Sequence, residues 1–296
     1  MRVFVTGASG FLGRAISRAL LARGDTVIAL SRGGEGEAGA ELLRGDPTQS
    51  GPWRERVRGC DAVLHLAGEP VAGKRWNAEQ KRILRQSRVD SGGQIAQAIA
   101  ALPAAQRPKV LVTASGIDLY PFDKSDREYA EDAPPGHSFL AELCLAWEAA
   151  TAQAAERTVA LRIGLVLGKG EGVIAKLVTP FRLFVGGPVG SGEQWTSWIH
   201  VDDVVGAALL ALDEGSLHGP LNLVAASVRQ RDFAQALGDA LKRPAWLPVP
   251  SLVLRAALGE IAEYLVHGRR AVPAALGTAG YAFKQADLGA AIAASI

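Results

Sequence analysis

Residues 1–16 read MRVFVTGASGFLGRAI, and this stretch decides the fold. The run RVFVTG is apolar and β-branched and ends in glycine, which predicts a buried strand. FLGRAISRALLARG then carries an apolar stripe at helical spacing and ends at Gly24, which predicts a helix. Gly7, Gly10 and Gly13 lie between the two as G-x-x-G-x-x-G. Glycines there allow a tight turn and a close approach to phosphate, so the pattern predicts a dinucleotide pyrophosphate at the helix N-terminus.

The same alternation continues along the chain. TVIALS, DAVLHLAG, PKVLVTAS and TVALRIGLVLG read as further buried strands, and helical patterns at 77–101 and 138–156 lie between them. This order predicts an α/β fold, a doubly wound parallel Rossmann sheet with a smaller C-terminal substrate lobe. We place the Rossmann domain at residues 1–168, with 196–226 returning to it. The substrate lobe then comprises 169–195 and 227–296.

Composition narrows the class of partner. The 296 residues are 48% hydrophobic and 21% charged, with a net charge of +2, which gives no case for nucleic acid or membrane binding. Two cysteines are too few for a disulfide framework or a zinc site, so we expect no metal. With no secretory signal at the start, we expect a cytoplasmic protein. Its partner would be a small molecule, sugar-like or anionic, and its state a monomer or homodimer.

The end of the second strand bears on the choice of cofactor. NAD-binding units carry an acidic residue there, which accepts hydrogen bonds from the ribose 2′-hydroxyl. This chain has Ser31 followed by Arg32. A serine can donate to a 2′-phosphate and an arginine can pair with it, so the sequence predicts NADP(H), unless Arg32 is an ordinary exposed loop arginine. Asp46, after a weaker strand, could reach the adenine amino group or cap a turn.

Several motifs give the chain a family resemblance. TGASGFLG (6–13), HLAG (65–68), LRIGLVLG (161–168) and WIHVDD (198–203) resemble the extended short-chain dehydrogenase/reductases of the epimerase and dehydratase type. RWN…K…SRV (75–89), SFLAELCLAWE (138–148), GGPVGSGEQWTSWIHVDD (186–203) and RPAWLPVP (243–250) resemble an atypical epimerase-like subfamily. The resemblance covers the whole chain. It implies cofactor contacts from Gly7, Ser9, Gly10, Phe11, Leu12, Gly13, Leu66, Ala67, Gly68, Ile163, Gly164 and Leu165.

The usual acid–base pair of that family is missing here. The family resemblance implies Y-x-x-x-K on a helix, where the tyrosine transfers the proton and the lysine lowers its pKa. When Glu148 is matched to the downstream acidic position, the tyrosine site is Leu140 and the lysine site is Cys144. Leucine has no proton to give, and a cysteine between leucines and a tryptophan reads as an inert core residue. The remaining candidates are Ser115, Asp118 and Tyr120, or a water that they hold.

Two segments are expected to form the substrate wall. Arg75 and Trp76 come just after the predicted cofactor loop, and Gln194 and Trp195 follow a glycine-rich stretch that can turn tightly. A basic helix face lies nearby, which either is solvated or meets an anionic substrate; it carries Lys81, Arg85 and Arg88.

Two functions are consistent with these patterns. The first is an NADP(H)-dependent oxidoreductase or nucleotide-sugar epimerase/dehydratase-type enzyme that lacks the usual Tyr-x-x-x-Lys pair. The alternative is a catalytically inactive NADP(H)-binding sensor or regulatory protein. The glycine loop is expected in both cases, because both proteins would bind the cofactor. The missing Tyr-x-x-x-Lys pair is what leaves the choice between them open.

Overall fold

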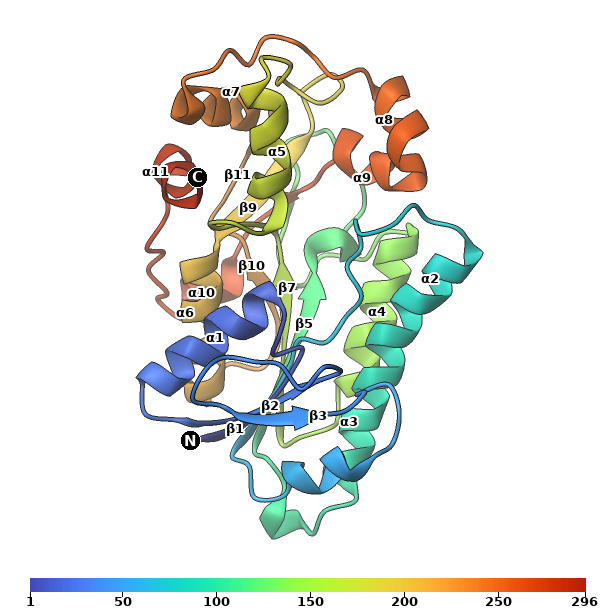
Figure 1. The fold of residues 1–296 in the computed structure, drawn as a ribbon, viewed down its shortest axis with the longest axis vertical. Coiled ribbons are helices and arrows are strands. Elements are labelled where there is room, and N and C mark those ends of the chain that lie inside the picture. The colour runs from blue at the N-terminus through green and yellow to red at the C-terminus, as the bar shows by residue number, and fades with distance from the viewer.

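Seven strands form one parallel sheet at the centre of the protein (Figure 1). The structure, a computed structural model, describes the backbone of residues 1–296 and every side chain except that of Val173. The strand order is β10-β7-β5-β4-β1-β2-β3, with the chain reversing direction across the sheet after β3. The strands span β1 Arg2–Thr6, β2 Thr26–Ser31, β3 Glu41–Arg44, β4 Ala62–His65, β5 Val110–Gly116, β7 Arg157–Ile163 and β10 Gly219–Leu223.

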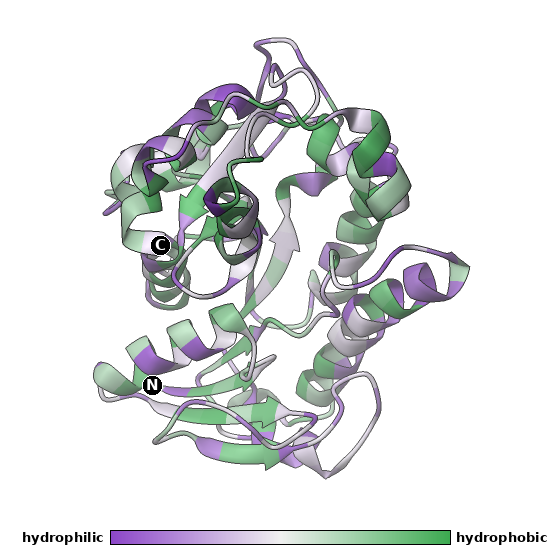
Figure 2. Cartoon of the chain, turned by 45° about the horizontal axis from the view of Figure 1, so that its top comes forward, coloured by the Kyte–Doolittle hydropathy of each residue, from purple (hydrophilic) through white to green (hydrophobic). Residues whose placement is uncertain are grey.

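Helices cover both faces of this sheet, and most of its buried strand residues are apolar (Figure 2). On one face, α1 (Phe11–Ala22) and α6 (Val201–Asp213) pack side by side over Val3, Val5 and Val27. On the other, α3 (Ser91–Ala100) covers Phe4 and Leu111, and α4 (Phe139–Thr151) packs beside it. Helix α2 (Ala78–Arg85) runs into α3 through a π-helical turn, Gln86–Asp90. The doubly wound α/β fold is therefore confirmed.

The C-terminal elements gather above the carboxyl ends of the sheet strands (Figure 1). A three-stranded sheet has the order β11-β9-β8, with β8 Leu165–Leu167, β9 Trp195–His200 and β11 Ala226–Arg229. A two-stranded pair joins β12 (Arg270–Ala271) to β6 (Glu128–Tyr129). The helices are α5 Gly172–Arg182, α7 Gln230–Leu241, α8 Ser251–Leu258, α9 Ala262–Val266, α10 Ala274–Thr278 and α11 Leu288–Ser295. Where the domain boundary falls stays a prediction.

One predicted strand proved to be two. The apolar run TVALRIGLVLG contributes β7 to the large sheet and β8 to the three-stranded sheet, with Gly164 between them. A Cβ at Gly164 would lie 2.8 Å from the carbonyl oxygen of Ser197, so β9 approaches too closely for any other residue. Gly164 therefore marks the point where the chain leaves the central sheet.

Candidate active site

The glycine loop between β1 and α1 forms an anion-binding N-terminus. Gly7 has a φ of +69°, and a Cβ there would lie 2.7 Å from the carbonyl carbon of Leu66. Both facts require glycine. No side chain caps α1 at Gly10, so the first N–H groups of the helix have no side-chain acceptor. Together with the helix dipole they favour a phosphate at this point, where the strand order reverses between β1 and β4.

A groove of about 410 Å³ extends from this loop. Several predicted cofactor residues line it: Gly7, Ser9, Gly10, Ser31, Arg32, Asp46, Leu66, Ala67 and Gly68. Among the described residues, the other predicted contacts lie outside the lining: Phe11, Leu12, Gly13, Ile163, Gly164 and Leu165. Other residues that line the groove were not predicted from the sequence. They are Thr48, Glu69 and three residues of α2 and its π-helical turn, namely Ile83, Gln86 and Ser87.

Ser31 and Arg32 at the end of β2, and Asp46 after β3, have distinct partners. The hydroxyl of Ser31 donates to the Glu35 carbonyl at 2.7 Å and accepts from the Glu35 N–H at 2.7 Å. The Arg32 side chain is 76% exposed and reaches Glu69 only at 4.0 Å, so it can move toward a ligand. Asp46 Oδ1 accepts from the N–H of Thr48 at 2.9 Å and from its hydroxyl at 2.7 Å. Asp46 therefore caps a turn at the groove edge.

A larger hollow of about 1250 Å³ lies elsewhere, between α4 and the strands β5, β7 and β10. Its lining includes Lys109, Leu145, Ala149, Arg157 and Gly219. The glycine loop is not part of that lining. The backbone N–H groups of the glycine loop, which could hold the phosphates of a dinucleotide, therefore border the smaller groove and not this hollow.

Helix α4 carries apolar groups where the family resemblance implies an acid–base pair. Leu140 is 3% exposed and packs with Trp76 and Leu143, and Cys144 is 6% exposed. Burial raises the pKa of the Cys144 thiol to about 12, with the nearby carboxylate of Asp118 acting in the same direction. A thiol in this state is protonated at neutral pH, so Cys144 is an inert core residue.

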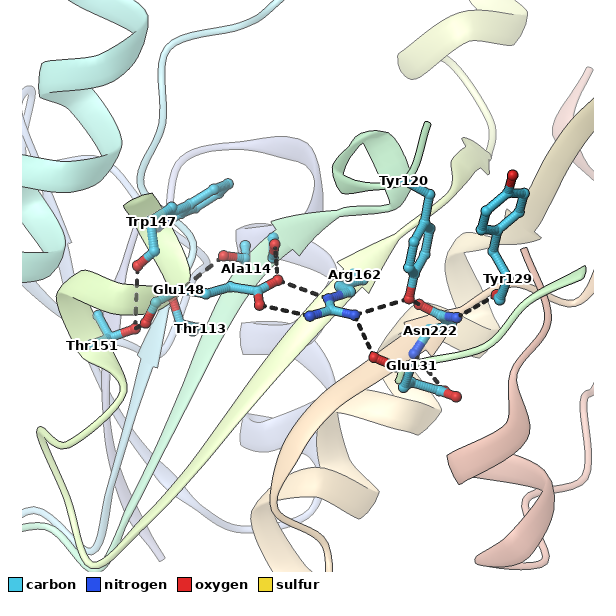
Figure 3. Close-up of polar contacts among 11 residues, drawn as sticks. Thr113, Ala114, Tyr120, Tyr129, Glu131, Trp147, Glu148, Thr151, Arg162 and Asn222 are labelled. Atoms are coloured by element: carbon cyan, nitrogen blue, oxygen red, sulfur yellow. Dashed lines mark hydrogen bonds and ion pairs between the residues drawn. The ribbon is translucent and has the colours of Figure 1, made fainter. Parts of the chain in front are cut away.

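A buried polar network binds two of the candidate catalytic hydroxyls (Figure 3). Ser115 and Arg162 are register partners on β5 and β7. Ser115 donates to Glu148 Oε1 at 2.6 Å, and Arg162 pairs with both oxygens of Glu148 at 2.9 Å. Tyr120 is fully buried; its hydroxyl accepts from Arg162 at 2.9 Å and donates to Asn222 at 2.8 Å. Burial raises the pKa of Tyr120.

Asp118 differs from these two candidates because its side chain is 37% exposed. It follows β5 and forms an ion pair with Arg269, which is itself buried. A Cβ at Gly116 would lie 3.8 Å from Asp118 Oδ2 and 3.6 Å from Cys144 Sγ, so the carboxylate lies near Cys144 in the middle of α4. Two atoms of Arg269, Nε and Nη2, are buried without a protein partner.

The predicted substrate residues are distributed over two places. Arg75 is exposed beside Gly259, whereas Trp76 is 8% exposed and lies against Tyr264 with ring centroids 5.5 Å apart. Tyr264 in turn accepts from the Leu140 N–H at 3.1 Å. An ion pair of 2.6 Å between Lys81 and Glu260 joins the same two parts of the chain.

Gln194 and Trp195 lie apart from that contact. Gln194 is 1% exposed and donates to the carbonyls of Val189 and Leu265. Two guanidinium groups lie against the ring of Trp195. The Cζ atom of Arg229 is 3.8 Å from the ring centroid, and that of Arg270 is 4.9 Å from it. In the structure, both side chains make contacts that join C-terminal segments of the chain to one another.

Two pairings were not predicted from the sequence: Arg162 with Glu148, and Asp118 with Arg269. A signal existed for the first, since Arg162 directly follows the apolar residues 159–161 of its strand and a buried charge needs a partner. Nothing local indicated the second, because its members are 151 residues apart. In the described part of the chain, no group of three or more His, Cys, Asp or Glu side chains is arranged to hold a metal ion. Nor does any described helix combine the length and apolar character that crossing a bilayer requires.

Comparison with known proteins gives relatives of similar length. The chain is 40% identical to the bovine "Epimerase family protein SDR39U1", over 99% of this chain and 98% of that protein. It is 37% identical to the chloroplastic homologue of Arabidopsis thaliana, over 96% of this chain and 83% of the relative. The crystal structure of the human protein with NADPH superposes with a TM-score of 0.87, at 36% identity, covering 99% of this chain and 98% of the other.

Two family models match successive parts of the sequence. A domain of unknown function (DUF1731) matches residues 249–295, which include α8 to α11. The model of the NAD dependent epimerase/dehydratase family matches residues 3–223, including the glycine loop, the central sheet and the Arg162–Glu148 network. The chain therefore belongs to the NAD dependent epimerase/dehydratase family.

Proposed function

We propose that this protein binds NADP(H) in the groove beside the glycine loop. One observation carries the proposal. At the outer end of the groove, β2 ends at Ser31 and is followed by Arg32, and neither residue is the carboxylate of an NAD-binding unit. The Ser31 hydroxyl already bonds the Glu35 backbone, so the mobile guanidinium of Arg32 would pair with the 2′-phosphate. The uncapped start of α1 would hold the pyrophosphate. The solved human relative, which contains NADPH, supports the same assignment.

Titration tests this proposal. NADPH and NADH are added separately while tryptophan fluorescence or heat is followed. We expect NADPH to bind more tightly, and Arg32→Asp to weaken its binding by about 1–3 kcal/mol because a charge-assisted pair is lost. Arg58→Asp, an exposed arginine outside the groove lining, is the matched control and should bind NADPH as the wild type does. Equal affinity for the two cofactors would contradict the proposal.

We further propose redox or epimerase-type chemistry on a small, sugar-like or anionic substrate, with Asp118 as the acid–base group. Bound NADP(H) would supply or accept the hydride. Asp118 is the candidate with an exposed side chain, whereas the hydroxyls of Ser115 and Tyr120 are buried in hydrogen bonds. Arg269 would hold the Asp118 carboxylate in one orientation. A carboxylate so held could take a proton from a substrate hydroxyl.

The competing function is cofactor binding without turnover. It is favoured by Leu140 and Cys144, which bury the usual acid–base positions under apolar packing. Screening carbonyl compounds and nucleotide sugars for NADPH oxidation, with Asp118→Asn beside the wild type, separates the two. Turnover that Asp118→Asn abolishes without loss of NADPH affinity supports the enzyme. Tight NADPH binding with no turnover across the screen supports the sensor. The cytoplasmic location and the monomer or homodimer state stay predictions.

A further inference from the structure

Arg88 is a buried arginine without an acidic partner. Its residue is 9% exposed, and its Nη1 donates only weakly, to the Leu84 carbonyl at 3.3 Å and the Ser87 hydroxyl at 3.4 Å. The guanidinium lies 5.0 Å from the ring centroid of Trp147. Among the side chains that the structure describes, no carboxylate lies within ion-pair distance of it. Burying an unpaired charge is costly, so the position of Arg88 needs an explanation.

The π-helical turn explains why Arg88 points inward. A regular helix would place Arg85 and Arg88 on the same face, as the sequence predicted. The turn Gln86–Asp90 changes that register, so Arg85 is exposed while Arg88 is buried. The prediction of one continuous basic face was wrong for this reason. Single π-helical turns inside α-helices are rare and occur frequently at functional sites.

The guanidinium of Arg88 lies at the inner end of the cofactor groove. A Cβ at Gly68 would lie 3.2 Å from its Cζ and 3.3 Å from its Nη2, and Gly68 lines the groove. Glu69 and Asp118 are close enough for their charges to act on Arg88. The outer end of the groove is at Ser31 and Arg32, so a dinucleotide held there by its adenosine half must extend its other half toward Gly68 and Arg88.

We propose that Arg88 provides a fixed positive charge beside the nicotinamide half of the bound dinucleotide, and so makes the protein prefer NADPH over NADP⁺. This inference rests on the proposed NADP(H) binding. The oxidised nicotinamide ring carries a positive charge and the reduced ring is neutral, so a buried guanidinium disfavours only the oxidised form. Of the two acidic groups nearby, Asp118 is paired with Arg269, and Glu69 lies beyond ion-pair distance of Arg88. At partly buried distances such a repulsion amounts to about a tenfold difference in affinity.

The test compares three ligands: NADPH, NADP⁺ and adenosine 2′,5′-bisphosphate, which lacks the nicotinamide half. The variants are Arg88→Met, which removes the charge at similar length, and Arg88→Lys, which keeps it. Arg85→Met removes an exposed charge one turn away and is the matched control. Dissociation constants come from calorimetry. We expect the wild type, Arg88→Lys and Arg85→Met to prefer NADPH by about tenfold, and Arg88→Met to bind both forms nearly equally. The bisphosphate should bind all four proteins alike.

Three results would overturn the inference. These are equal affinity of the wild type for NADPH and NADP⁺, an unchanged ratio in Arg88→Met, or a change of bisphosphate affinity in Arg88→Met as large as its change of NADP⁺ affinity. Failure of the wild type to bind any of the ligands would instead refute the proposed function. Because Arg88→Met removes a buried charge, its ligand-free form should melt at or above the wild-type temperature. If that variant does not fold, the ratio measured in Arg88→Gln decides.

Discussion

Arg162 and Glu148 form a buried ion pair in which both carboxylate oxygens accept from one guanidinium, each at 2.9 Å. The arginine comes from β7 and the carboxylate from α4, so the pair fastens this helix to the sheet (Figure 3). The carboxylate raises the pKa of Arg162, against the effect of burial. Ser115 and Tyr120 complete the hydrogen bonds of the pair.

Breaking this pair should destabilise the protein strongly. Glu148→Ala leaves the Arg162 charge buried without its partner, and we expect a loss of about 3–5 kcal/mol in the free energy of unfolding. Urea denaturation of the cofactor-free protein measures it. The double variant Glu148→Leu with Arg162→Met removes both charges and should recover much of the loss. A single variant as stable as the wild type would show that the network contributes little.

Removing the Tyr120 hydroxyl should affect stability and leave cofactor binding intact. Tyr120→Phe leaves Arg162 and Asn222 each with one hydrogen bond fewer, for an expected loss of about 1–3 kcal/mol in the free energy of unfolding. Tyr129→Phe is a matched control, since its hydroxyl donates to Asp123 near the surface at 2.7 Å, and a smaller loss is expected. If Tyr120 were the proton donor, Tyr120→Phe would abolish any turnover that Tyr129→Phe retains.

Stability should fall as the pH is lowered from about 6.5 to 4. Burial lowers the pKa of His65 from 6.5 to about 4, where Thr6 at 2.7 Å and Ser91 at 3.2 Å contact its ring. Between these values the unfolded chain binds a proton that the folded protein does not, so acid favours unfolding. The expected loss is about 3 kcal/mol, complete near pH 4.

Chemical denaturation at a series of pH values measures this loss, and His65→Gln should flatten the slope between pH 6.5 and 4. Neighbouring contributions are separated by their pH range. The pKa values of Asp25 and Asp123 are lowered by hydrogen bonds and, for Asp25, by its ion pairs, so their contributions are lost mainly below this window. A slope that persists unchanged in His65→Gln would assign the effect to other groups.

The parts of the fold that depend on neighbouring residues could be predicted from the sequence. The strand, glycine loop and helix of residues 2–22 occupy the predicted places, because turn geometry and helical periodicity are local. Asn77 begins α2 by accepting from the Gln80 N–H, again a local contact. The groove lining from Gly7 to Gly10 follows directly from that geometry.

The features that depend on distant segments could not be predicted. Aspartate is a common N-cap residue, yet at the start of α6 it is His200, and neither Asp202 nor Asp203, that caps the helix, by accepting from the Asp202 N–H at 3.2 Å. Asp203 is instead fully buried and accepts from the N–H groups of Lys284 and Gln285, more than 80 residues away. The π-helical turn likewise has no local signal that distinguishes it from regular helix, since its register follows from tertiary packing.

Tyr264 contacts Trp76 and the N–H of Leu140, and these contacts join the C-terminal helices to the rest of the protein. The two family models meet at this contact, since Trp76 and Leu140 lie in the first and Tyr264 in the second. A chain that ended after residue 248 would expose the Trp76 ring and leave the start of α4 without this acceptor. The two segments that the family models match should therefore not unfold independently of each other. We expect them to unfold together in a single transition.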